Sequence, residues 1–214
     1  LVVDRAERRL DVLRALEVPG ARLPPPGAAD VAHVSWIAGA SGLLMLADLL
    51  PQFLPGVEVE FSLPSGWTAQ SVYEADKDGK HHVLQPEETV FLIGRGLRKQ
   101  AKRFDGGAFD FVVDGSWPFK DAALVKAATK VFEEYLALTG FPLQLRPLVM
   151  LARLPVATGS VKWRAETRGA TVVLLMDPQA NVANWAGQLG IIFTHELLHL
   201  WVPNSLLLEG DYDW

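Results

Sequence analysis

Five residues near the end of the chain, His195 to His199, have the types and spacing needed to bind a divalent cation beside a base. They read His-Glu-Leu-Leu-His within an apolar run, Ile191 to Trp201, which predicts a buried helix. Residues four apart in a helix lie on one face, so both imidazoles can reach the same ion. Glu196 then lies beside the ion, placed to take a proton from water. This pattern is typical of zinc hydrolases.

The alternative interpretation is that these three side chains belong to an ordinary core. His195 and His199 would then bond to the backbone, and Glu196 would lie at a polar seam. Burying ionisable groups is costly unless they are paired or bound to a metal, and a buried glutamate without a partner is rare. We therefore favour the metal site. Such a site needs a third protein ligand, and only fifteen residues follow His199.

The composition is that of an ordinary globular chain, with 50% hydrophobic and 21% charged residues among 214. The net charge of −5 gives no electrostatic footprint for nucleic acid, so no nucleic-acid partner is expected. The basic cluster from Arg95 to Arg103 is local and predicts a solvated turn and strand end. The chain has no cysteine, which excludes disulfides and thiolate ligands.

No transmembrane segment and no signal peptide are expected. The longest apolar stretch, Trp36 to Leu50, is interrupted by Gly39, Gly42 and Asp48, and it is too short to span a bilayer. The chain starts at Leu1 without a charged segment followed by an apolar one, as a signal peptide would have. The compartment, cytoplasmic or periplasmic, is left open.

The pattern of apolar and turn-forming residues changes near Gly115, which predicts two domains. Residues 1–115 hold short alternating segments separated by Gly and Pro, and this pattern favours an antiparallel β-sandwich-like domain. The first twenty residues could instead hold one amphipathic helix. The clearest expected features are strands at 57–63, 89–93 and 108–113 and a hairpin turn at 76–79.

Residues 116–214 predict helices and buried strands in alternation. Apolar residues recur at helical spacing from Asp121 to Leu138, and Gly140 and Pro142 then end the helix. This order suits the first, incomplete part of an α+β catalytic domain, so the fold class is α+β. The other expected elements are strands at 145–154 and 171–176 and a helix at about 183–201.

The motif and its flank resemble the gluzincin metallopeptidases. His195 to Trp201 matches H-E-x-x-H-x-W, which is most similar to the glycyl aminopeptidase family. Phe61 to Trp67 is similar to that family's strand-Pro-x-Gly-Trp segment, and Gly115 to Trp117 lies where the family passes into its catalytic domain. The resemblance implies an N-terminal β-domain, a thermolysin-like catalytic domain with zinc, a peptide or protein substrate, and a possible PDZ domain downstream.

The resemblance also implies where the third zinc ligand lies. In that family it is a glutamate in a W-x-x-E-G pattern on the next helix. Asp211 to Trp214 resembles the approach to this pattern, so the glutamate and the catalytic tyrosine are expected beyond Trp214. The chain is therefore expected to be a fragment that lacks full activity. Glu209 could supply a ligand instead, but a surface-loop carboxylate is the favoured interpretation.

The family carries a G-G-x-E-H segment on an edge strand, whose glutamate can bind the substrate's amino terminus. The nearest match is residues 164–168, which makes Glu166 the candidate substrate-binding residue. Both glycines and the histidine are missing here, so a preference for N-terminal glycine is not carried over. A solvated loop carboxylate or an edge-strand carboxylate is the alternative for Glu166. We expect His33 at the surface or a strand edge, and His81 and His82 in solvent beside a turn.

The sequence therefore predicts zinc-dependent peptide hydrolysis, as an aminopeptidase. His195 and His199 would bind zinc, and Glu196 would act as the general base. The competing hypothesis is a non-catalytic pseudopeptidase that binds peptides or serves as a scaffold. A glutamate in the W-x-x-E-G position would favour the enzyme over the binding protein.

Overall fold

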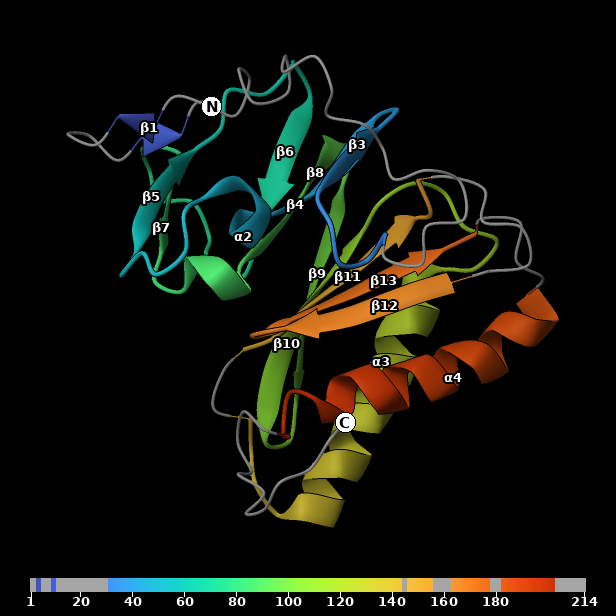
Figure 1. Ribbon diagram of the computed structural model, residues 1–214. Coiled ribbons are helices and arrows are strands. Elements are labelled where there is room, and N and C mark those ends of the chain that lie inside the picture. Colours follow the sequence, from blue (N-terminus) through green and yellow to red (C-terminus); the bar gives the residue numbers. More distant parts are fainter. Residues whose placement is uncertain are drawn as a thin grey trace.

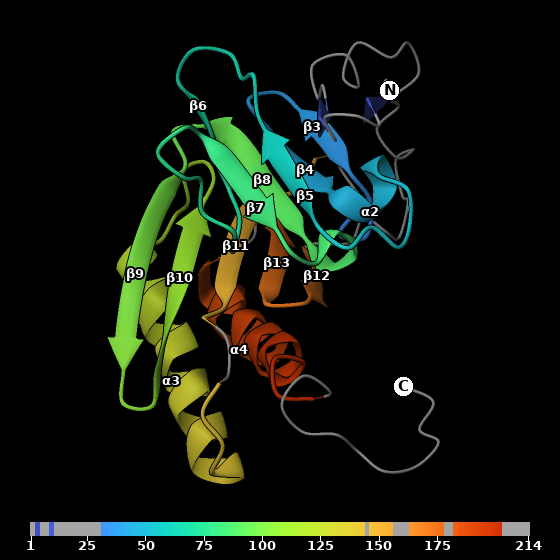
Figure 2. The same cartoon turned by 90° about the vertical axis from the view of Figure 1, so that its left-hand side faces the viewer.

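The computed structural model describes residues 3–4, 9–10, 31–143, 146–155, 163–177 and 182–202, and of residues 182–189 it describes the backbone. In these ranges a four-stranded antiparallel sheet, a five-stranded mixed sheet and two long helices form successive layers (Figure 1). Figure 2 shows the two helices on the side of the five-stranded sheet that faces away from the four-stranded sheet.

The N-terminal part consists of antiparallel strands, as the sequence predicts. The four-stranded sheet has the order β3-β4-β8-β6, and a separate pair joins β5 to β7. Val3–Asp4 (β1) pairs with Arg9–Leu10 (β2), which is incompatible with one helix over the first twenty residues. The remaining elements are β3 (Trp36–Ala38), β4 (Ser41–Met45), α2 (Leu46–Leu49), β5 (Val57–Glu60), β6 (Trp67–Gln70), β7 (Lys80–Val83), the 3-10 helix η1 (Pro86–Glu88) and β8 (Val90–Arg95).

The predicted hairpin turn at 76–79 is confirmed, but one of the histidines beside it is not in solvent. The Asp76 N–H donates to the Lys80 carbonyl at 2.8 Å across this turn. On β7 the side chains alternate, so His82 reaches the surface whereas His81 is buried. The His81 ring packs edge-on against Phe91, and the expectation of a solvated His81 is therefore wrong.

The five-stranded sheet has the order β12-β13-β11-β10-β9, with parallel pairing of β10 to β11 and of β11 to β13. It begins at Arg98, ahead of the boundary predicted at residue 115. Two strands that the sequence analysis grouped with the N-terminal part thus belong to the sheet that carries the helices. Its strands are β9 (Arg98–Phe104), β10 (Gly107–Val113), β11 (Leu148–Arg153), β12 (Trp163–Arg168) and β13 (Thr171–Met176).

Two helices, α3 (Asp121–Thr139) and α4 (Val182–Leu198), cover one face of this sheet (Figure 2). The end of α3 is confirmed at Gly140, whose φ of 71° is left-handed and whose N–H bonds to the Leu136 carbonyl. Of the helices in the described ranges, none is long and apolar enough to cross a membrane. The core beneath them includes Phe109, Phe111, Leu124, Phe132, Leu174, Phe193 and Trp201.

The opposite face of the five-stranded sheet is covered by the four-stranded sheet. Met150 and Leu175 share a core there with Trp36 and Leu92. All six residues of β13 are buried, as expected for a central parallel strand that is covered on both faces. Strand β12 lies at the edge of the sheet, and its outer edge pairs with no other strand that the structure describes.

Packing of α3 against the sheet should contribute strongly to stability. Phe132 is fully buried and stacks on Phe109, whereas Leu138 on the same helix is 79% exposed. Replacing Phe132 with Ala should lower the free energy of unfolding by about 3–5 kcal/mol, because it removes buried area and leaves a cavity. The matched control, Leu138→Ala, should change it by less than about 0.5 kcal/mol. Urea denaturation followed by circular dichroism measures both, and equal effects would contradict this packing.

Candidate functional site

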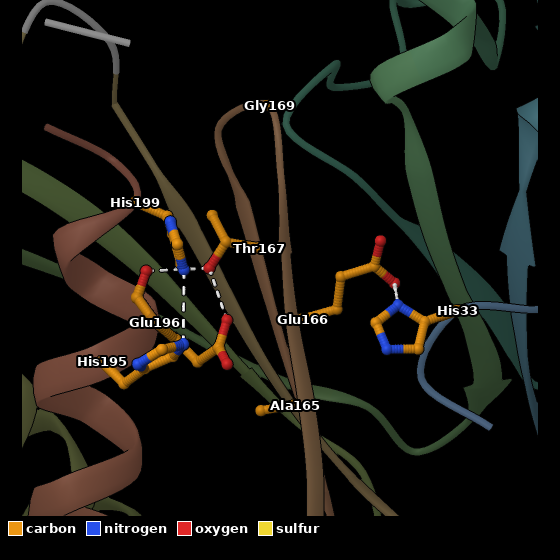
Figure 3. Close-up of a pocket in the computed structure, with 8 residues that line it drawn as sticks. All are labelled: His33, Ala165, Glu166, Thr167, Gly169, His195, Glu196 and His199. Carbon is orange, nitrogen blue, oxygen red and sulfur yellow. Dashed lines mark hydrogen bonds and ion pairs between the residues drawn. The ribbon is translucent and has the colours of Figure 1, made fainter. Parts of the chain in front are cut away.

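The last turns of α4 bring the two motif histidines together. The Nε2 atoms of His195 and His199 are 3.4 Å apart, and the ring centroids are 5.0 Å apart at an interplanar angle of 81° (Figure 3). Two nitrogens that each lie about 2.05 Å from a tetrahedral zinc ion are separated by about 3.3 Å. The two rings therefore have the spacing that a shared metal ion requires.

Helix α4 is buried on one face only, which corrects the prediction of an interior helix. Ile192, Phe193 and Leu197 face the sheet, whereas Ile191 is 72% exposed. His195 lies on the exposed face. The reason is that α4 belongs to an outer layer, so only one stripe of the helix contacts the sheet. The apolar residues flanking the motif thus do not seal the histidines from solvent.

Glu196 is held in position by a contact with the edge strand β12. Its side chain is buried, and the Thr167 hydroxyl lies 2.8 Å from its main-chain carbonyl oxygen and 2.9 Å from its Oε2. A hydroxyl has one hydrogen, so Thr167 donates to one of these acceptors at a time. The contact joins the carboxylate to the edge strand and restricts its position beside the two imidazoles (Figure 3).

The histidines and Glu196 open onto a cavity of about 350 Å³. Three segments that are distant in sequence form its wall: the loop before β3, the strand β12 with its following turn, and the end of α4. Gly169 in that turn has a left-handed φ of 53°, and its Cα lies so close to Glu88 that a Cβ would come within 3.0 Å of the carboxylate. The lining residues are His33, Ala165, Glu166, Thr167, Gly169, His195, Glu196 and His199.

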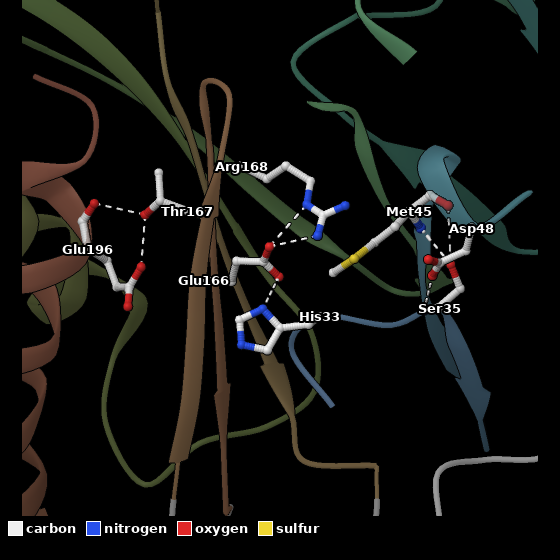
Figure 4. Close-up of polar contacts among 8 residues, drawn as sticks. All are labelled: His33, Ser35, Met45, Asp48, Glu166, Thr167, Arg168 and Glu196. Atoms are coloured by element: carbon white, nitrogen blue, oxygen red, sulfur yellow. Dashed lines mark hydrogen bonds and ion pairs between the residues drawn. The ribbon is translucent and has the colours of Figure 1, made fainter. Parts of the chain in front are cut away.

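Glu166 lines the same cavity, but its carboxylate lies on the other side of β12 from Thr167 (Figures 3 and 4). This follows from strand alternation, which sends consecutive side chains to opposite faces. Oε1 accepts hydrogen bonds from Arg168 Nε at 3.0 Å and Nη2 at 2.8 Å. His33 Nδ1 lies 2.8 Å from Oε2. The side chain is only 14% exposed, so it is not a solvated loop carboxylate, although it does lie on the edge strand β12, as the alternative interpretation allows.

His33 is a cavity residue that the sequence analysis did not identify. It was expected at the surface, and its side chain is indeed 48% exposed, yet it contacts Glu166 across the cavity. The sequence carries no local signal for this contact, because it joins a loop before β3 to a strand more than half the chain away. Only the packing of the N-terminal sheet against the five-stranded sheet brings the two residues together.

The structure places two candidate metal ligands and a candidate base at one site. In the part of the chain that the structure describes, no group of three or more His, Cys, Asp or Glu residues could hold a metal ion. Glu209, the alternative third ligand within this chain, lies outside the described residues, as do Asp211 to Trp214. His195 and His199 thus stay two candidate metal ligands, and the third ligand stays a prediction.

Comparison with known proteins gives a likeness of fold. No protein-family model and no curated protein matches the sequence. The structure is similar to the crystal structure of an aminopeptidase N family protein from Idiomarina loihiensis, with a TM-score of 0.66 and 13% sequence identity. The match covers 78% of this chain and 31% of that chain, so the chain corresponds to less than a third of that protein's length.

The contact from Thr167 to Glu196 can be tested through stability. Thr167→Val keeps the shape of the side chain but removes the donor, so the buried carboxylate loses a partner. The free energy of unfolding should fall by about 1–3 kcal/mol. Thr167→Ser keeps the hydroxyl and should recover most of this loss. Urea denaturation measures the difference, and a valine variant as stable as the wild type would contradict the role of the hydroxyl.

Proposed function

We propose that the protein containing this chain is a zinc-dependent peptidase, and that it acts as an aminopeptidase. The observation that supports this most is the 3.4 Å separation of the His195 and His199 Nε2 atoms beside the buried Glu196 carboxylate. The similarity of fold to an aminopeptidase N family protein supports the peptidase class. The five-stranded sheet with α3 and α4 would form the first part of a thermolysin-like catalytic domain, and the N-terminal antiparallel sheets would form its β-domain.

His195 and His199 would hold the zinc ion through their Nε2 atoms, whose spacing fits tetrahedral coordination. The third protein ligand in this proposal is a carboxylate outside the described residues, as the gluzincin resemblance implies. When bound, zinc lowers the pKa of water and polarises a carbonyl group. The cavity in front of the histidines provides room for a peptide bond at the remaining position.

Glu196 would act as the general base. Its carboxylate accepts a proton from the water that attacks the peptide carbonyl, and then delivers that proton to the leaving amine. A base must stay within hydrogen-bond reach of both groups, and the contact with Thr167 at 2.9 Å limits the movement of its Oε2. Strand β12 thus positions the base, and Glu166 on the same strand is the candidate contact for the substrate's amino terminus.

The competing proposal is a pseudopeptidase that binds peptides or serves as a scaffold. It draws on the observation that the described residues supply two ligands and not three. In that case the cavity would bind a chain terminus, and Glu196 would have no chemical task. Metal affinity and turnover of the full-length protein separate the two proposals, because the binding protein needs neither.

The first test replaces the base. In the full-length protein, Glu196→Gln should reduce kcat for peptide hydrolysis by about a hundredfold to ten-thousandfold, since the amide cannot accept the proton. Zinc content, measured by atomic absorption, should stay at the wild-type level. The exposed Glu133 on α3 offers a matched control, and Glu133→Gln should leave kcat unchanged. Wild-type turnover in the Glu196→Gln variant would rule out this role.

The second test removes a metal ligand. His195→Ala or His199→Ala should weaken zinc binding by more than the roughly 10- to 100-fold that loss of a supporting partner costs, because a direct ligand is lost. His82→Ala, an exposed histidine on β7, is the control and should bind zinc as the wild type does. Isothermal titration calorimetry with zinc measures the affinities of the three variants and of the wild type. Equal affinities in the four proteins would place the metal elsewhere or exclude it.

A further inference from the structure

The Glu166 carboxylate is in the cavity, but one of its two oxygens is covered. Less than 1 Å² of Oε2 is exposed, and this atom makes no well-aligned hydrogen bond within the described residues. Its contact is the 2.8 Å approach of His33 Nδ1, which has the distance of an ion pair. Oε1 is engaged by Arg168 on the same strand. His33 therefore occupies one approach to Oε2 (Figure 4).

His33 is presented to Glu166 by a segment that is fixed to the N-terminal sheet. The Ser35 N–H donates to Asp48 Oδ2 at 2.6 Å, and the Ser35 hydroxyl accepts from the Met45 N–H at 2.8 Å (Figure 4). The indole N–H of the buried Trp36 donates to the Val31 carbonyl at 3.0 Å. The backbone on both sides of His33 is thus bonded, so the fold fixes the position from which the imidazole reaches Glu166, while the side chain itself stays free to rotate.

We propose that His33 is a specificity-determining residue, which occupies the oxygen of Glu166 that the amino group of a peptide substrate would contact. This inference rests on the proposed function, in which Glu166 receives an amino terminus. The His33 ring, whose Nδ1 lies 2.8 Å from Oε2, and a substrate ammonium would occupy the same position beside this oxygen, so they compete for it. A free amino terminus therefore binds by displacing His33, whereas a peptide with a blocked amino terminus gains nothing from that displacement.

Arg168 restricts the exchange of partners to one oxygen of Glu166. Its guanidinium holds Oε1 through two donors, so the carboxylate keeps its position when Oε2 changes partner. The side chain of His33 is half exposed and has solvent beside it into which it can move. Only molecules in which His33 has left Oε2 bind an amino terminus. The apparent affinity is then the intrinsic affinity multiplied by the fraction of such molecules. Removing the imidazole should restore that affinity.

Equilibrium binding of alaninamide, with N-acetylalaninamide as the blocked counterpart, tests the proposal. Titrations are followed by NMR in the full-length protein carrying Glu196→Gln, so that no probe is consumed. His33→Ala should tighten alaninamide binding by about tenfold, as expected when one charge-assisted competitor is removed. N-acetylalaninamide should bind equally before and after the change. His82→Ala is the matched control and should alter neither affinity.

A double-mutant cycle assigns the effect to Glu166. In the Glu166→Gln background, His33→Ala should no longer change the affinity for alaninamide. Weaker or unchanged binding of alaninamide in His33→Ala, or an equal gain for the acetylated probe, would overturn the proposal. His33→Asn, whose shorter side chain falls short of Oε2, provides a second variant if the alanine variant does not fold. Because the readout is binding without turnover, its failure is distinguishable from failure of the peptidase proposal, which shows in zinc affinity and hydrolysis.

Discussion

Burial of both faces of the five-stranded sheet is the constraint on which the rest of the structure depends. Strand β13 is buried along its whole length, and β11 is buried except at Arg153. Such strands are stable only if a layer covers each face, and here α3 and α4 cover one face while the four-stranded sheet covers the other. The candidate site residues therefore lie at the edge strand β12, where the two covering layers end.

Strand β12 connects the two covering layers because neighbouring side chains on a strand face opposite ways. Thr167 bonds to Glu196 on α4, whereas Glu166 contacts His33 from the N-terminal part. One strand thus ties together the candidate base and the candidate substrate contact. The turn after β12 is tightly packed, because a Cβ on Gly169 would lie 3.0 Å from the Glu88 carboxylate. The β12–β13 hairpin thus contacts both the N-terminal part and α4 at the cavity.

Features that depend on local residue spacing could be predicted from the sequence. Features that depend on contacts between segments distant in the sequence could not. The helical period from Asp121, ended by Gly140 and Pro142, predicts α3 to within a residue, and the apolar run at 171–176 coincides with β13. The juxtaposition of His195 and His199 follows from their spacing of four. Strands β9 and β10 have a local pattern like that of the preceding strands, and only the parallel partner β11 assigns them to the five-stranded sheet. Thr167 and His33 could not be predicted as site residues for the same reason, because their contacts arise from tertiary packing.

The wide separation of His33 and α4 along the chain has a consequence for biosynthesis. The antiparallel strands of the four-stranded sheet leave the ribosome before α4 does, and their hydrogen-bonded pairing is among themselves. The helix that bears both imidazoles emerges last among the described elements, and the cavity exists only after it docks. A nascent chain that carries the N-terminal sheets alone therefore has neither the pair of imidazoles nor the cavity beside them.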